Sequence, residues 1–252
     1  MHRRRFYGRR RGPGLGARQR HLLESGLSGL AIALDKGDLP LDPVGLFGRN
    51  SGFIGLEIGF GKGEHLAQLA ARYPERDFIG CEPFLNGLAT MAVTAQETGL
   101  RNVRLFDDDA RLLIDRLPDQ CIDIVFLLHP DPWPKRRHRK RRFLNEDNLD
   151  AIARILKPGG EFRIATDSEI YKRWTAIRMS ARQDFEWLAE RAADWRTPPP
   201  DWLATRYARK AVREGRSDAW FRYRRCPSSN ASSIARSSAA TAAPGPSGWS
   251  QT

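Results

Sequence analysis

Short apolar runs alternate with stretches of helical periodicity in the middle of this chain, and that alternation restricts the fold more than any other feature. The apolar runs cover residues 53–58, 78–81, 103–106, 122–128 and 161–165. Helical patterns lie between them, near residues 63–72, 84–98, 109–116 and 143–156. Because strand–helix–strand units cross over in the right-handed sense, the pattern predicts an α/β fold with a mostly parallel central sheet and helices on both faces.

The flanking segments set the limits of this core. With 252 residues, 40% of them apolar, the chain is long enough for one sizeable core and too short for two. We expect a helix over residues 17–34, a loop over 40–52 and a last strand over 220–224. The Lys-Pro-Gly-Gly sequence at 157–160 is expected to stop a helix and turn into a strand, and the three prolines at 198–200 to form a rigid linker.

Positive charge is concentrated in three windows of the chain. The formal net charge is +12, whereas residues 1–20, 135–142 and 203–225 together carry +21, so the remainder is net −9. A general preference for Arg over Lys explains the residue type but not the clustering. Basic patches on an acidic body are typical of a protein that binds a polyanion, and they favour nucleic acid as the partner.

These observations divide the chain into one domain with two tails. We expect a basic flexible arm over 1–20, a single domain over 21–225 that ends in a basic RNA-binding segment at 203–225, and a disordered tail over 226–252. In that tail 19 of 27 residues are Ser, Ala, Pro or Gly. Such a composition buries too little apolar surface to offset the entropy of ordering the chain.

Cysteine usage and hydropathy exclude several classes of protein. Cys81, Cys121 and Cys226 are odd in number, widely spaced and without a CxxC pair, so neither a disulfide framework nor a zinc site is indicated. The basic start is followed by Gly-Pro-Gly at 12–14 instead of a signal peptide's apolar stretch, and no apolar run approaches membrane-spanning length. We therefore expect a cytoplasmic protein with no membrane partner and no metal. The sequence does not determine the oligomeric state, although a monomer is favoured.

A glycine-rich loop follows the first apolar run, at the position where open parallel sheets bind nucleotides. It reads GFGKG over residues 59–63, and Glu57 precedes it. The spacing differs from the GxGxxG of dinucleotide sites, and Glu57 would repel a pyrophosphate.

Glu82 follows the second apolar run, where an acid accepts ribose hydroxyls. Asp109 follows the third, as an adenine contact or equally as a helix N-cap. Three acids at successive strand ends suit a cationic adenosyl group, so we favour S-adenosylmethionine over NAD.

After the fourth apolar run the sequence reads HPDPWPKRRHRKRR over residues 129–142. This resembles the tRNA (guanine-N7-)-methyltransferase family, whose hallmark is a PDPWxK segment that runs into a basic RxxKRR stretch. The resemblance covers about residues 53–225 and includes, in order, LEIGFGKGE, the acid at Glu82, DDDA at 107–110, a TD-x-E motif at 166–169 and a TKF-like segment at 205–207. It implies a Rossmann-like class I methyltransferase that uses S-adenosylmethionine to methylate N7 of the variable-loop guanine, m7G46, in tRNA.

The resemblance also implies roles for individual residues. It makes Asp131 the catalytic residue. The implied cofactor-binding residues are Glu57, Gly59, Gly61, Glu82, Asp109 and Asp131. The implied substrate-binding residues are Lys135, Asp167, Thr205, Arg206 and Tyr207. The implied RNA-binding residues are Arg137, His138, Arg139, Lys140, Arg141 and Arg142.

The residues around Asp131 are compatible with this chemistry. Guanine N7 carries an in-plane lone pair and no proton, so methyl transfer needs alignment and no general base. A carboxylate after the fourth strand can bind the N1–H and N2 amino edge of guanine and offset the charge that the base acquires. Pro130 and Pro132 restrict the backbone on both sides of Asp131, and Trp133 either stacks on a base or packs in the core.

Three positions depart from the family pattern, and other interpretations stay open. His129 replaces the usual Phe, Ser168 replaces the Trp of TDWE, and Ala208 replaces the glutamate that closes TKFE. Ala208 supports a catalytically weak RNA-binding protein on the same fold. An amino-group methyltransferase of another RNA or of protein would carry [DN]PP[YFW], whereas Asp131-Pro132 is followed here by Trp133. Glu57 argues against an NAD-dependent oxidoreductase.

Overall fold

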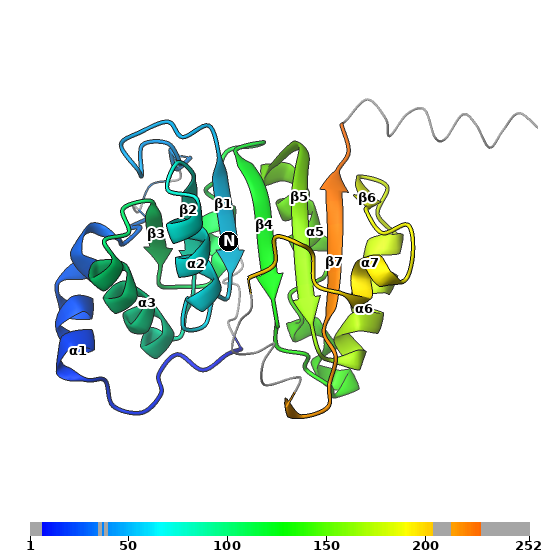
Figure 1. Ribbon diagram of the computed structural model, residues 1–252, viewed down its shortest axis with the longest axis horizontal. Helices are drawn as coiled ribbons and strands as arrows, with labels where there is room; N and C mark the ends of the chain where they lie inside the picture. Colours follow the sequence, from blue (N-terminus) through cyan, green and yellow to red (C-terminus); the bar gives the residue numbers. More distant parts are fainter. Residues whose placement is uncertain (1–6, 35–36, 38–39, 204–212, 228–252) are drawn as a thin grey trace, which may run out of the picture.

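The computed structural model describes residues 7–34, 37, 40–203 and 213–227. Within these residues, seven strands form one sheet in the order β3-β2-β1-β4-β5-β7-β6 (Figure 1). The strands up to β5 pair in parallel, and β7 runs antiparallel to both β5 and β6. The strands are β1 (Ile54–Ile58), β2 (Asp77–Cys81), β3 (Val103–Phe106), β4 (Ile122–Leu128), β5 (Leu156–Thr166), β6 (Phe185–Trp187) and β7 (Ala219–Arg225).

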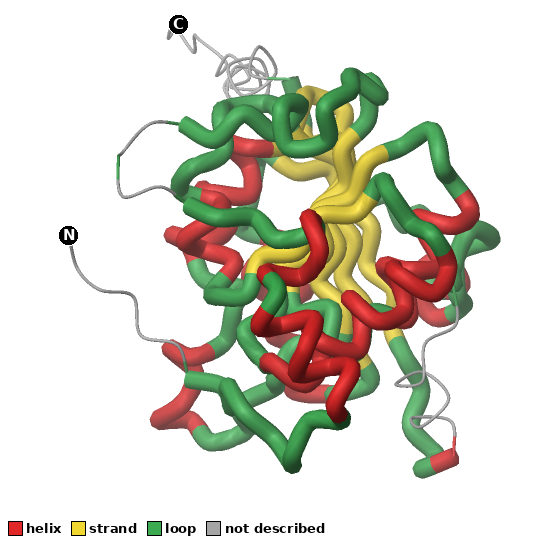
Figure 2. The backbone as a smooth tube through the Cα atoms, turned by 90° about the vertical axis from the view of Figure 1, so that its left-hand side faces the viewer, coloured by secondary structure: helices red, strands yellow, loops and turns green. Residues whose placement is uncertain are grey.

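Helices cover both faces of the sheet, as the tube view from the side shows (Figure 2). One face carries α1 (Ala17–Glu24), α2 (Glu64–Arg72) and α3 (Leu85–Thr98). The other carries α4 (Ala110–Ile114), α5 (Glu146–Ile155) and α6 (Glu169–Ser180). The short α7 (Ala193–Arg196) lies beside β7. The α/β fold with a mostly parallel sheet, predicted from the alternating pattern, is therefore confirmed.

The central strands are buried on both faces, which explains why they are apolar almost throughout. In β1, Leu56 and Ile58 belong to the core on the side of α4 and α5. On the opposite face, Phe78 and Phe126 pack in the core beneath α2 and α3. Leu56 is fully buried, and burial of one such side chain stabilises a fold by about 1.5–3 kcal/mol.

The helix expected over residues 17–34 is shorter than predicted. It ends at Glu24, and a 3-10 turn, η1 (Gly26–Gly29), follows. Ile32 N then donates to Leu105 O at 2.8 Å, and Leu105 N donates to Leu30 O at 2.7 Å. Gly29 has φ +81°, which a continuing helix cannot accommodate. The apolar residues after the turn thus extend the edge of β3 instead of completing a helix.

The Lys-Pro-Gly-Gly sequence at 157–160 stops α5 as expected, but it lies within β5 and not between two elements. Ile122 pairs with Leu156 whereas Ile124 pairs with Glu161, so the extra residues form a bulge opposite β4. A Cβ on Gly160 would lie 2.9 Å from Asp123 O. Glycine is therefore required where the bulge approaches its neighbour.

Several elements were not predicted, and part of the N-terminal arm packs on the domain. The sequence pattern did not indicate α6, α7 or β6. In the arm, Leu85 N donates to Arg10 O at 3.0 Å, and Gly12 N donates to Asn86 Oδ1 at 2.8 Å. Residues 10–12 thus lie along the start of α3. Within the described part of the chain, no helix is long and apolar enough to cross a bilayer.

Candidate active site

A cavity of about 480 Å³ opens at the carboxyl ends of the central strands. It lies where β1 adjoins both β2 and β4, the point at which the strand order reverses direction and open α/β sheets bind ligands. Its size is within the range of about 300–1,000 Å³ that is usual for small-molecule sites. We call it the glycine-loop cavity. Among its lining residues are Gly59, Gly61, Glu82, Asp109, His129, Pro130, Asp131, Trp133, Lys140 and Arg141.

The glycine loop forms the floor of this cavity by a close approach of two backbones. Gly59 and Gly61 have φ +72° and +62°, which side chains rarely tolerate. A Cβ added to Gly87, in the first turn of α3, would lie 2.0 Å from Gly61 O. The loop and α3 are therefore in direct backbone contact, and Gly87 is needed as much as the glycines of the motif.

Glu82 holds the loop and faces the cavity. Its Oε2 accepts from Gly61 N at 2.7 Å, and its Oε1 accepts from Phe84 N at 2.9 Å. Burial raises the pKa of Glu82 from 4.5 to about 7, although both backbone hydrogen bonds act in the opposite direction. An acid positioned in this way can accept hydrogen bonds from hydroxyl groups once it is ionised.

Asp109 lines the cavity and caps a helix at the same time. Its Oδ1 accepts from Arg111 N at 3.1 Å and from Arg111 Nε at 2.9 Å, so it is the N-cap of α4. The N-cap role is therefore confirmed, and the adenine contact stays a prediction that the position of Asp109 on the cavity wall permits. Arg111 also lines the cavity and neutralises the Asp109 carboxylate.

Glu57 lies beneath the loop and is not among the residues that line the cavity. Its Oε2 lies 2.8 Å from His65 Nδ1, and both side chains are only 4% exposed. The His65 ring packs edge-on against Phe126 at 4.9 Å. Glu57 thus ties β1 to α2 within the core, and it does not share a cavity wall with Glu82, Asp109 and Asp131. Sequence reasoning missed His65, although it lies only two residues after the glycine loop.

The loop after β4 brings Asp131 to the mouth of the cavity. His129 N donates to Ala165 O at 2.7 Å, and His129 and Trp133 both have positive φ, at 47° and 42°. Strained backbone of this kind persists only where surrounding contacts hold it. Asp131 is exposed, and partial burial against the cavity wall raises its pKa.

Arg142 supplies part of that support. Its Nε donates to Pro132 O at 2.9 Å, and its Nη2 donates to Trp133 O at 3.1 Å. The guanidinium also lies 4.6 Å from the Trp174 ring centroid. Arg142 is buried, so this member of the expected RNA-binding set holds the loop instead of facing solvent.

The preceding residues form a basic segment, which we define as residues 135–141. Most of it is η2 (Arg136–Arg141), a 3-10 helix with no buried side chain. Arg141 Cζ lies 4.8 Å from the ring centroids of both Tyr7 and Trp133. Tyr7, Gly8 and Arg9 line the glycine-loop cavity beside it. The basic segment and the N-terminal arm therefore meet at the cavity mouth, which the sequence signalled only by their shared charge.

A second cavity, of about 660 Å³, adjoins the first along His129 and Pro130, which line both. We call it the Asp167 cavity. Asp167 Oδ2 lies 3.0 Å from Arg216 Nη1, which links the end of β5 to the segment before β7. Lys135 lines neither cavity. Thr205, Arg206, Tyr207 and Ala208 lie outside the described residues.

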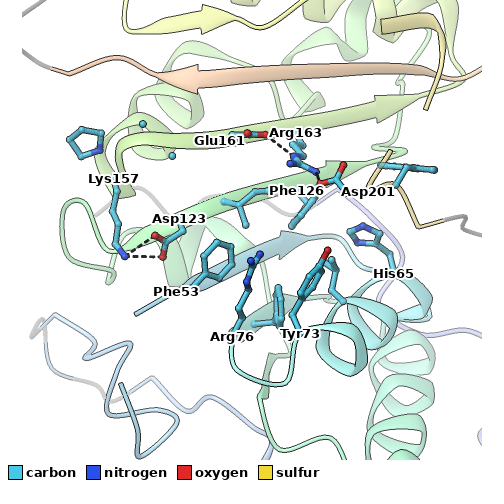
Figure 3. Close-up of a pocket in the computed structure, with 17 residues that line it drawn as sticks. Phe53, His65, Tyr73, Arg76, Asp123, Phe126, Lys157, Glu161, Arg163 and Asp201 are labelled. Atoms are coloured by element: carbon cyan, nitrogen blue, oxygen red, sulfur yellow. Dashed lines mark hydrogen bonds and ion pairs between the residues drawn. The ribbon is translucent and has the colours of Figure 1, made fainter. Parts of the chain in front are cut away.

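A third cavity, of about 460 Å³, lies on the face of the sheet and shares no lining residue with the other two (Figure 3). Lys157 Nζ lies 2.8 Å from Asp123, and Arg163 lies 2.8 Å from Glu161 and 2.6 Å from Asp201. These ion pairs join strands and a loop within the wall. None of the site residues expected from the sequence lines this cavity.

Comparisons with known proteins agree with this geometry. Residues 51–220 match the family described as "Putative methyltransferase". The chain is 50% identical over 220 residues to the tRNA (guanine-N(7)-)-methyltransferase of Rhizobium meliloti, covering 87% of this chain and 94% of the relative. It is 48% identical to the protein of the same description from Agrobacterium fabrum, covering 86% and 94%. A variant of the 16S rRNA (adenine(1408)-N(1))-methyltransferase from Catenulisporales acidiphilia has a similar fold, with a TM-score of 0.51, 16% identity and coverage of 75% and 93%.

Proposed function

The chain belongs to the tRNA (guanine-N7-)-methyltransferase family of class I S-adenosylmethionine-dependent enzymes, and we propose that its acceptor is the guanine at position 46 in the tRNA variable loop. The observation that carries the proposal is the junction of the two cavities. The glycine-loop cavity holds the acids and the loop that suit the methyl donor. The Asp167 cavity adjoins it at His129 and Pro130, with Asp131 beside the junction.

The residues present fit the donor. S-adenosylmethionine supplies a methyl group on a cationic sulfonium. Ionised Glu82 would accept hydrogen bonds from the ribose hydroxyls, and Asp109 lies further along the same wall. The backbone of Gly59 and Gly61 leaves room for close approach. Glu57 would act indirectly, by holding β1 against α2, because its carboxylate contacts His65 and does not line the cavity.

We assign binding of the acceptor guanine to Asp131. Guanine N7 would use its lone pair to form the new carbon–nitrogen bond while the donor's methyl–sulfur bond breaks. The electron pair of the broken bond stays on sulfur, which leaves as a neutral thioether, no proton is transferred, and the purine becomes cationic. A carboxylate at the junction can bind the N1–H and amino edge and stabilise that developing charge. Holding the two reactants in line supplies the remaining catalysis, up to roughly 7–11 kcal/mol in well-aligned systems.

The surface around the junction favours RNA. The basic segment is exposed beside the cavity mouth, and Arg141 packs between Tyr7 and Trp133. Arginine and aromatic faces together suit a phosphate backbone and unstacked bases. Lys135 belongs to this surface. We also infer that the protein works in the cytoplasm, where its tRNA substrate is found.

The test is mass spectrometry of nucleosides from an unmodified tRNA transcript incubated with the full chain and S-adenosylmethionine. We expect one N7-methylguanosine per transcript. A matched transcript with adenine at position 46 should receive none. Methylation of the control transcript, or methyl groups on an exocyclic amine, would overturn the assignment. RNA binding without transfer would instead identify the chain as an RNA-binding protein on this fold.

A further inference from the structure

Three side chains with metal-binding atoms meet at one edge of the sheet. His129 follows β4, Asp167 follows β5 and Asp218 precedes β7. Because β7 is antiparallel to β5, its first residue lies at the carboxyl ends of its neighbours, with Ala219 opposite Thr166. The topology therefore brings together residues that are distant in sequence, and two of them line the Asp167 cavity.

The distances leave room for an ion between them. His129 Nδ1 lies 3.8 Å from Asp167 Oδ1 and 3.8 Å from Asp218 Oδ1, which is too long for hydrogen bonds. One ligand atom from each residue lies within 4.8 Å of the other two. In a triangle with these sides, the equidistant point is at most about 2.5 Å from each atom, and metal–ligand bonds to N and O measure about 2.0–2.6 Å.

Asp218 gives an independent indication that a ligand is expected there. Its side chain is 4% exposed, and its Oδ1 has no hydrogen-bond partner among the residues that the structure describes. A buried carboxylate oxygen without a partner is costly unless a cation approaches it. The two oxygens of Asp167 face different partners. Its Oδ2 lies 3.0 Å from Arg216 Nη1, whereas its Oδ1 faces His129.

We propose that His129, Asp167 and Asp218 bind one divalent transition-metal ion at the edge of the Asp167 cavity. One imidazole and two carboxylates are donors that suit Mn²⁺, Fe²⁺ or Zn²⁺. Three protein ligands leave coordination positions open toward the cavity. The backbone hydrogen bond of His129 to Ala165 fixes the main chain from which the imidazole projects, at a positive φ. The ion would link the ends of β4, β5 and β7.

The test uses Mn²⁺ as the probe with the purified, chelator-treated full chain, because Mn²⁺ binds thiols weakly. Loss of the electron paramagnetic resonance signal of free Mn²⁺ reports binding, and we expect one ion per chain that added Zn²⁺ displaces. Asp218→Asn and His129→Phe should each weaken binding at least about 100-fold. His21→Ala and Asp150→Asn, at exposed positions on α1 and α5, should bind as the parent does.

Thermal unfolding without metal separates a lost ligand from a lost fold. Asp218→Asn removes a buried charge, so the metal-free variant should unfold within a few degrees of the parent. Added Mn²⁺ should raise the unfolding temperature of the parent and not of this variant. Absence of binding at about 1 mM Mn²⁺, or equal binding by the two ligand variants, would refute the site. The assay contains neither RNA nor methyl donor, so its outcome is independent of the proposed acceptor.

Discussion

The raised pKa of Glu82 predicts that donor affinity depends on pH. If the ribose hydroxyls bind only the ionised carboxylate, each pH unit below the pKa lowers affinity about tenfold. With a pKa of about 7, the dissociation constant for S-adenosylmethionine should fall about tenfold between pH 6 and pH 8 and then level off. Glu82→Gln should bind more weakly at pH 8 and lose this pH dependence.

The assay is isothermal titration calorimetry of the full chain at pH 6, 7 and 8 and constant ionic strength. The donor's own amino group titrates equally with both proteins, so the difference between parent and Glu82→Gln isolates the carboxylate. The stability of the fold should change in the opposite direction from donor affinity, falling as pH rises. The folded state keeps the proton that the unfolded chain releases above pH 4.5, so unfolding free energy should fall by about 3 kcal/mol as pH rises to about 7. An identical pH dependence of affinity in parent and variant would refute this reasoning.

Four further predictions concern individual residues. Asp131→Asn should lower the single-turnover methylation rate at least ~100-fold while donor affinity changes little; retention of half the parental rate would contradict its role. Alanine at the four Arg and Lys residues of the basic segment after residue 136 should reduce the salt dependence of RNA affinity by up to about one unit of log–log slope per lost phosphate contact, measured by filter binding, whereas an unchanged slope would mean that the segment does not touch RNA. Gly87→Ala should destabilise the protein by ~1–3 kcal/mol in urea unfolding. Gly14→Ala is the control, because nothing lies within 4 Å of its added Cβ. Equal stabilities of the two variants would mean that α3 shifts to accommodate the added methyl group. Ala208→Glu should change kcat/KM for tRNA by less than ~10-fold, since one hydrogen bond to a charged group contributes about 1.5–3 kcal/mol and neighbouring groups remain; a hundredfold gain would show that the natural enzyme is impaired.

The parallel strands could be predicted because each is a continuous apolar run bounded by turn residues. Val103–Phe106 and Ile122–Leu128 agree with the expected ranges at both ends. Helix ends were less accurate where tertiary contacts decide them. Beyond Glu24 the chain leaves the helix because Leu30 and Ile32 bond to Leu105 on the edge of β3, a partner about 75 positions away that no local pattern reveals.

The sequence predicts which residues meet at the site to the extent that it predicts where the strands end. The glycine loop, Glu82, Asp109 and Asp131 line one cavity because parallel strands end at the same edge. Side-chain direction was not predictable. Glu57 points into the core toward His65, and the choice between the two faces of β1 depends on packing. Asp218 was not singled out, because its approach to His129 requires the reversed direction of β7.

The positions of the two cavities along the chain also set the order in which they can be assembled during translation. Every residue that lines the glycine-loop cavity lies between positions 7 and 148. The Asp167 cavity draws on residues 129–217 and needs β7 to hold its last wall. A nascent chain therefore contains every residue of the glycine-loop cavity before the last residues of the Asp167 cavity have been synthesised. Ribosome-bound chains of increasing length should therefore bind S-adenosylmethionine at a shorter length than the one at which they bind the acceptor.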